Sequence, residues 1–278
     1  MPSMSGFRSR GGPSSTRSLQ FFHFGHQCPH NAHLLARIQS FAKQEGIPLR
    51  VVDVSRDEDA CERFRIFSPN MLLVNEKYRL HGPFSWERVK TMVDDEDIES
   101  EAYGINQSED VVRGSLVPLT SQSVLSTCWP CMGSEDERLC KGKSEWVVTV
   151  TRSLGLEHLG YLHFYGGRCV GGAEFLPSES VPYPIPDKRK DNAFLTCSFV
   201  SDEKKDYKTY PMTRMIDDLG GLGFNTLSVA ASRDVVFPNG PLEWFLKKGF
   251  ADGGVLITEV LHKAEIHYLQ LRLNKTKL

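Results

Sequence analysis

The chain has 278 residues, of which 40% are hydrophobic and 24% charged, and its formal net charge is -2. This length allows two domains with separate cores, while the charge provides neither a basic face for nucleic acid nor a strong field toward membranes. No apolar run approaches the ~20 residues of a membrane span. We therefore expect a soluble, cytoplasmic protein that binds neither nucleic acid nor membrane.

Residues 1–18 are expected to form a disordered tail. They carry three arginines and no acidic residue among Gly, Pro and Ser, a composition that an organelle-targeting segment would share. A Gly-Gly-Pro run opposes the amphipathic helix of such a segment, so a tail is favoured.

Residues 19–93 are predicted to alternate between strands and helices. Pro29 suits a first helical turn because its missing N–H would be unpaired there anyway. Ser55 and Glu58 match a capping box, and Ser85 is a further N-cap. The expected order is strand, helix, strand, helix, strand, strand, helix, over 19–24, 28–44, 49–54, 55–65, 70–74, 77–81 and 85–93.

This order, with Cys28–Pro29 at the first helix start and Ser68–Pro69 before the third strand, resembles the thioredoxin fold. The resemblance implies that Pro69 follows a cis peptide bond and lies against the reactive Cys28. A thiol at a helix N-terminus gains from the helix dipole and the free N–H groups, so a lowered pKa is expected. Asn31 stands where a dithiol enzyme has its second cysteine. The alternatives are then a monothiol reaction, a binding group, or a module kept for docking a protein partner.

Residues 94–120 are interpreted as a linker, because six acidic residues occur in the eight positions 94–101. The following segment, 121–143, is expected to be loop-like and contains Cys128, Cys131 and Cys140. With seven cysteines and no secretory signal, thiols or metal ligands are favoured over disulfides. These three cysteines could bind zinc or act in redox chemistry, or they could be small buried side chains.

Residues 121–278 are predicted to form the second domain. A Gly166-Gly167 turn indicates a hairpin, and four prolines between 177 and 186 exclude regular structure there. Residues 103–118 are ambiguous, and 145–153 fits a helix or a strand. The expected strands are 159–165, 168–176, 192–200, 224–231, 253–260 and 265–273, with a helix starting near Pro211.

The strand, loop, helix and strand from Asn192 to Ala231, closed by Trp244-Phe-Leu-Lys-Lys-Gly-Phe250, resemble the GNAT acyltransferase fold. The fold class expected for the whole chain is therefore α/β (α+β), a thioredoxin-like domain followed by a GNAT-like mixed sheet. The resemblance implies acetyl-CoA as cofactor, with pantetheine along one strand and the diphosphate at the next helix start. The residues that it implies are Leu195, Cys197, Phe199, Val200, Lys204, Lys205 and Lys208.

Two departures from the GNAT pattern concern the chemistry. No glycine occurs from 177 to 219, so the loop lysines would have to replace the usual backbone cradle. Phe245 stands where many of these enzymes have a proton-donating tyrosine, which leaves Tyr207 or Tyr210 as the acid. Glu174 or Glu179 could take the proton of the attacking amine.

Three functions are consistent with the sequence. The first is an N-acetyltransferase that acts on a small-molecule or peptide amine. The second is a catalytically inactive binding or assembly protein built on the same two folds. The third is a thiol- or metal-handling protein that uses Cys28 and the Cys128 cluster.

Overall fold

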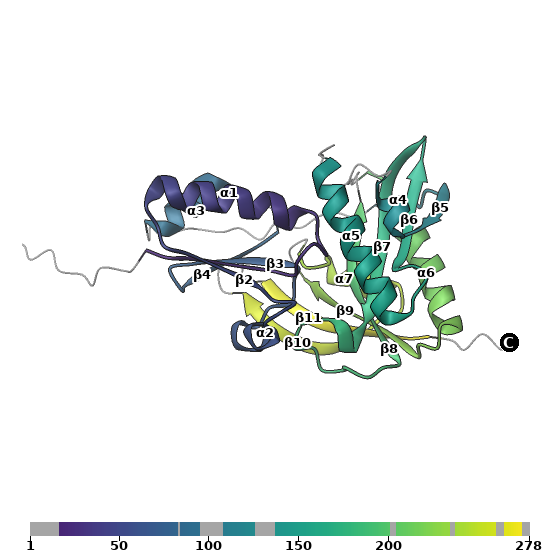
Figure 1. Cartoon of the computed structure of the whole chain (residues 1–278). Coiled ribbons are helices and arrows are strands. Elements are labelled where there is room, and N and C mark those ends of the chain that lie inside the picture. The colour runs from purple at the N-terminus through teal and green to yellow at the C-terminus, as the bar shows by residue number, and fades with distance from the viewer. Residues whose placement is uncertain are drawn as a thin grey trace, which may run out of the picture.

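The computed structural model describes residues 17–82, 84–94, 108–125, 137–200, 204–233, 237–259 and 264–273. They form a four-stranded and a seven-stranded sheet that meet across a shared hydrophobic core (Figure 1). Of the helices described, none is both long and apolar enough to cross a membrane. Cys128, Cys131 and residues 95–107 of the predicted linker lie outside the described residues.

The N-terminal sheet has the strand order β2-β1-β3-β4. Its central strand β1 pairs in parallel with β2 and antiparallel with β3. The elements follow the order predicted for 19–93: β1 (Leu19–His23), α1 (His30–Glu45), β2 (Leu49–Asp53), α2 (Glu58–Phe64), β3 (Asn70–Val74), β4 (Tyr78–His81) and α3 (Trp86–Val93).

The helix ends follow local chemistry. Ser85 caps α3 as predicted, accepting a hydrogen bond from the Arg88 amide. The capping box predicted at Ser55 is wrong, because Ser55 donates to Asp53 and Asp57 accepts from the Ala60 amide instead. Helix α1 ends at Gly46, whose φ of 64° favours glycine.

The C-terminal sheet has the strand order β10-β11-β9-β8-β7-β6-β5. The predicted Gly166-Gly167 hairpin is confirmed, and the ambiguous 145–153 is helical, in a helix that starts within the segment expected to be a loop. The elements are β5 (Ser115–Pro118), α4 (Ser121–Leu125), α5 (Glu137–Leu154), β6 (Gly160–Tyr165), β7 (Arg168–Pro177), η2 (Ser178–Ser180), β8 (Asn192–Val200), α6 (Thr209–Gly221), β9 (Thr226–Ser232), α7 (Leu242–Lys247), β10 (Ala251–Glu259) and β11 (Ala264–Arg272).

The two sheets share one of the three apolar clusters of the described chain. Helices α1 and α3 cover one face of the N-terminal sheet, while β10 and β11 lie on its other side (Figure 1). Phe22, Phe24 and Phe67 from this second face pack in the same cluster as Phe194 and Ile266 of the C-terminal sheet. Helices α6 and α7 bury the opposite face of the C-terminal sheet. The halves therefore pack as one body.

A polar contact between β4 and β10 also joins the two sheets. Glu259, at the end of β10, accepts from both Arg79 and His81 of β4, with His81 Nε2 2.7 Å from Glu259 Oε1. His81 Nδ1 lies 2.7 Å from Ser68 Oγ, and Ser68 Oγ also donates to the Asn70 carbonyl. Because a carboxylate only accepts, His81 Nε2 donates to Glu259, and the contacts through both ring nitrogens fix the orientation of the imidazole.

Candidate functional site

The central parallel strands β8 and β9 pair only over their first residues. Asn192, Ala193 and Phe194 are opposite Thr226, Leu227 and Ser228, and no pairing is recorded beyond them in the described chain. Strand β8 nevertheless continues to Val200, held on its other side by β7. Beyond Phe194, the β8 edge that faces β9 therefore has no strand partner among the described residues. Leu195, Cys197, Phe199 and Val200 all belong to this half of β8.

A side-chain amide spans the gap between these strands. Asn239 Oδ1 accepts from the Ser198 amide of β8 at 3.2 Å, and Asn239 Nδ2 donates to the Ala230 carbonyl of β9 at 3.4 Å. Asn239 is buried and comes from the segment that precedes α7. Asn239 thus replaces one of the hydrogen-bonded links between β8 and β9. A ligand that pairs with β8 would have to bind on the far side of Asn239. Nothing in the sequence pattern indicated this role.

The start of α6 is already occupied by an anion. Asp206 Oδ1 accepts from the Lys208 amide at 2.9 Å and the Thr209 amide at 2.8 Å, and Oδ2 accepts from the Thr209 hydroxyl. The backbone of Asp206 is fixed in turn, with its amide 2.9 Å from the Asp110 carbonyl. The N–H groups expected to receive a diphosphate thus bind a carboxylate of the chain itself. An Asp just ahead of a helix start is a recognisable capping signal that could have revealed this.

The three loop lysines have different environments. Lys204 and Lys205 are exposed, and Lys205 forms an ion pair with Asp110. Lys208 turns inward and is 3% exposed, with Nζ 3.2 Å from the Gly240 carbonyl and 4.4 Å from the Trp244 ring centroid. Its burial lowers the pKa of Lys208 to about 8. Lys208 therefore lies next to the residue that spans the strands rather than on the surface.

Tyr207 and Tyr210 pack on β6. Their rings lie 5.8 and 5.3 Å from the imidazole of His163, which also contacts the Tyr207 carbonyl through Nδ1 at 3.1 Å. Desolvation lowers the pKa of His163. Strand β6 is separated from the gap by β7 and β8, so the structure associates both tyrosines with His163.

Glu174 is the centre of a buried polar junction between the two sheets. Its Oε1 accepts from Gln27 Nε2 and Thr196 Oγ1, each at 2.7 Å, and its Oε2 forms an ion pair with Lys143. Glu174 is 2% exposed, and Lys143, which also donates to the Gln27 carbonyl, is buried as well. Glu179, by contrast, is exposed on η2. The sequence singled out Glu174 but not its partners, which come from the loop before α1, from α5 and from β8.

Tyr183 lies near the same junction and is 1% exposed. Its hydroxyl is buried without a hydrogen-bond partner among the described residues. Burial raises the pKa of Tyr183 well above its usual value, with Cys61, Cys28 and Glu174 adding to the effect. The side chain therefore stays neutral.

The prediction of an activated Cys28 is wrong. Burial raises the pKa of Cys28 to about 11, and this outweighs the amides of His30 and Asn31 and the charge of Lys143, which lower it. Helix α1 begins after Cys28 as expected, but the half-buried thiol lies near Lys143 of α5 and Glu174 of β7, where a thiolate is poorly solvated. Cys28 is accordingly a thiol at neutral pH.

The region around Pro69 also differs from the expectation. The described cis peptide bonds precede Pro238 and Pro241, so Ser68–Pro69 is trans. Asn31, in place of a second cysteine, donates from Nδ2 to the Gly25 and Pro69 carbonyls at 2.9 and 3.1 Å. It ties the loop before α1 to the loop before β3, which is a structural role.

No metal centre occurs in the part of the chain that the structure describes, since no group of three His, Cys, Asp or Glu side chains there could hold an ion. Cys140 is buried on α5. Cys128 and Cys131, the other two proposed ligands, lie outside the described residues.

No family model matches the sequence, and no curated protein matches it. Among solved structures it is similar to an N-acetyltransferase from Staphylococcus aureus Mu50, at 13% identity and a TM-score of 0.43, over 58% of this chain and 98% of that one. It is also similar to a ribosomal-protein-alanine N-acetyltransferase from Brucella melitensis, at 12% identity and a TM-score of 0.41, over 58% and 100% of the two chains. A third similar structure is an aminoglycoside 6'-acetyltransferase type Ii, at 16% identity and a TM-score of 0.40, over 58% of this chain and 98% of that one. At these values the likeness identifies neither the family nor the activity.

Proposed function

We propose that this chain is an acetyl-CoA-dependent N-acetyltransferase of the GNAT type, with residues 121–278 as the transferase domain, 19–93 as a thioredoxin-like accessory domain and 94–120 as the linker. The observation that carries the proposal is the parting of β8 and β9 after Phe194 and Ser228. Two buried parallel strands lose ladder hydrogen bonds by separating, and an extended amide-bearing ligand such as pantetheine restores them.

The thioester would lie along the second half of β8. The acceptor amine attacks the thioester carbonyl carbon, a C–N bond forms, and the C–S bond breaks to release a thiolate. Lys208 is a buried cation near this half of β8: its Nζ donates to the Gly240 carbonyl, and the neighbouring Asn239 accepts from the Ser198 amide. We assign it the proton that the thiolate takes up, in place of the tyrosines expected from the sequence.

The two glutamates take different roles in this proposal. Both oxygens of Glu174 already accept hydrogen bonds, so Glu174 orders Lys143, Gln27 and Thr196. Glu179 is exposed and is the remaining candidate to take the amine proton. The acceptor amine, whether on a small molecule or a peptide, is unspecified by these contacts.

The donor is expected to bind chiefly through pantetheine. Asp206 occupies the first amides of α6 with a negative charge, which opposes a diphosphate at that place. Isothermal titration with acetyl-CoA and with acetylpantetheine tests the proposal. We expect saturable binding of both, with affinities within about tenfold of each other. If neither ligand gives heat at millimolar concentration, the chain is not an acetyl-CoA-dependent enzyme.

A second candidate function is a binding or assembly protein without catalysis. It is favoured by the Asp206 carboxylate at the helix start and by Asn239 across the strands. The protein partner expected at the thioredoxin-like domain would have to use another face, because the C-terminal half covers the face beneath Phe22 and Phe24. Absence of acetyl-CoA binding both in the wild-type protein and in Asp206→Asn would select this function.

A further inference from the structure

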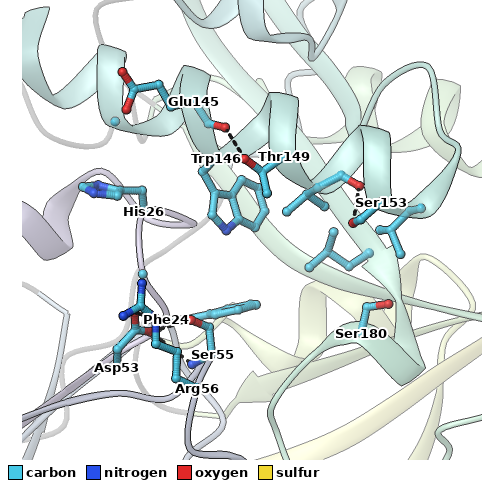
Figure 2. Close-up of a pocket in the computed structure, with 15 residues that line it drawn as sticks. Phe24, His26, Asp53, Ser55, Arg56, Glu145, Trp146, Thr149, Ser153 and Ser180 are labelled. Carbon is cyan, nitrogen blue, oxygen red and sulfur yellow. Dashed lines mark hydrogen bonds and ion pairs between the residues drawn. The ribbon is translucent and has the colours of Figure 1, made fainter.

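A cleft of about 500 Å³ opens between the N-terminal sheet and α5 (Figure 2), and none of its lining residues belongs to β8 or β9. One wall follows the carboxyl ends of β1 and β2, a pair of parallel strands, and this edge is where α/β sheets commonly bind ligands. The opposite wall is the outer part of α5. The residues that line it and matter here are Phe24, His26, Ser55, Arg56, Trp146 and Ser180.

The interior of the cleft is aromatic and apolar. Trp146 and Phe24 meet edge to face, with ring centroids 6.2 Å apart, and Val150, Leu154 and Leu176 continue the wall. Phe24 is 5% exposed and also contacts the Tyr183 ring, so the half-buried Trp146 supplies the aromatic surface that a ligand can reach. The body of a ligand here would therefore be aromatic.

Most hydroxyl groups at the cleft are already used as donors within the chain. Thr149 donates to the Glu145 carbonyl at 3.0 Å, and Ser153 donates to the Val150 carbonyl at 2.9 Å. Ser55 donates to Asp53 Oδ1 at 2.7 Å, and Asp53 also faces Arg56 at 3.8 Å. These groups offer a ligand no further proton.

The polar groups that remain are donors or cations. Trp146 Nε1 has no hydrogen-bond partner among the described residues, and in Figure 2 it points from the α5 side into the open space. Arg56 is 86% exposed at the rim with a single loose contact, and His26 borders the same space. The Glu145 carboxylate points away from the Trp146 ring (Figure 2). An indole N–H and a guanidinium together match a carboxylate.

We propose that this cleft is a binding site for a small aromatic carboxylate, with the ring beside Trp146, Val150 and Leu154 and the carboxylate toward the Trp146 indole N–H and Arg56. The site is separate from the proposed acyl-donor gap and does not depend on acetyltransferase activity. It lies where the two halves of the chain meet, so the ligand would contact both of them.

Naphthylacetate, its neutral amide naphthylacetamide and the cationic naphthylethylamine are suitable probes, because they share a ring and differ in charge. The four indole N–H resonances of the ¹⁵N-labelled full chain report binding, and Trp146→Phe identifies the one from Trp146. We expect naphthylacetate to shift that resonance saturably below 1 mM. The amide and the amine should bind at least about tenfold more weakly.

Two substitutions separate the site from unspecific binding. Trp146→Phe keeps the aromatic wall but removes the donor, and we expect about a tenfold loss of naphthylacetate affinity, with a similar loss for Arg56→Gln. Because Trp146→Phe lacks the reporting resonance, isothermal titration calorimetry measures the affinities of the variants and the wild type. Arg37→Gln is the matched control, since Arg37 stacks on Trp86 away from the cleft, and it should leave the affinity unchanged. No shift of the Trp146 resonance, equal affinities for the three probes, or a Trp146→Phe variant that binds as the wild type would each overturn the proposal.

Discussion

The Lys143–Glu174 ion pair is the residue-scale feature with the largest expected effect on stability. Both side chains are at most 2% exposed, so the loss of Lys143 leaves a buried carboxylate with only neutral donors. We expect Lys143→Met to lower the free energy of unfolding by about 3–5 kcal/mol, measured by urea denaturation. Lys205→Met removes an exposed ion pair and is the control, with no measurable change expected. A loss for Lys143→Met as small as that of the control would show that the pair contributes nothing to stability.

Tyr183 gives a prediction of the opposite sign. Its hydroxyl is buried without a partner in the described chain, and such a group carries a desolvation cost. Tyr183→Phe should therefore raise the free energy of unfolding by about 1 kcal/mol, whereas Tyr165→Phe on the exposed hairpin should not change it. Destabilisation by Tyr183→Phe would mean that the hydroxyl has a partner in solution.

The proposed role of Lys208 as proton donor can be tested at the scale of a single side chain. If its ammonium protonates the leaving thiolate, Lys208→Met should lower kcat by about 100-fold and leave acetyl-CoA affinity nearly unchanged. The wild-type rate should also fall as the pH rises through about 8, because Lys208 loses its proton there. The variant should lack this decline. A wild-type rate that stays flat from pH 7 to 9 would contradict the assignment.

At the scale of elements, Asp206 stabilises the start of α6 and opposes a diphosphate at the same point. Asp206→Ala should cost about 1–2 kcal/mol of stability, because two helix amides lose their acceptor. Asp206→Asn keeps a side-chain oxygen and should cost less, while it removes the negative charge and strengthens acetyl-CoA binding several-fold. Denaturation and calorimetry on the same two variants separate these effects. Weaker acetyl-CoA binding by Asp206→Asn would show that the carboxylate assists the cofactor instead.

The elements were largely predictable because their signals are local. The largely apolar run from Asn192 to Val200 and the Gly166-Gly167 turn are both signals between residues close in sequence, and the strand and the hairpin predicted from them are confirmed. The start of α5 was not predicted, because its helical pattern begins among cysteines and charged residues that read as a loop. The partners of Glu174 come from residues 27, 143 and 196, and only the tertiary fold brings them together.

The error at Cys28 has the same origin. A helix N-terminus lowers the pKa of a thiol that water can reach, and Cys28 does precede the first turn of α1 as the sequence predicts. Burial of Cys28 in the folded chain raises its pKa further than the helix lowers it. A sequence pattern reports which helix end a thiol occupies, but not what packs over it.

For the whole molecule, Glu259 predicts how stability depends on pH. Arg79 and His81 lower the pKa of Glu259 to about 2, from a usual value of 4.5, against the opposing effect of its burial. A carboxyl whose folded pKa is depressed adds stability above its unfolded pKa and loses that contribution as the pH falls. We therefore expect about 3 kcal/mol to be lost between pH 4.5 and 2. Urea denaturation across this range measures it.

Glu259→Gln should be less stable than the wild type at pH 6, with the difference shrinking as the pH approaches 2. Glu62→Gln, at an exposed pair with Arg65, should follow the wild-type curve throughout. A constant difference between Glu259→Gln and the wild type at every pH would show that the carboxylate charge is not what joins β4 to β10.

The apolar cluster shared by the two sheets also constrains how the sequence can change. A larger side chain at Phe22 or Phe67 would not fit, because Ile266 and Phe194 of the other sheet fill the same buried cluster. Substitutions in one half should therefore be accepted mainly when a compensating change arises in the other. The two halves would therefore evolve together. A chimera that joins the N-terminal half to the C-terminal half of another protein would lose the packing of the shared cluster, even if each half kept its own backbone fold.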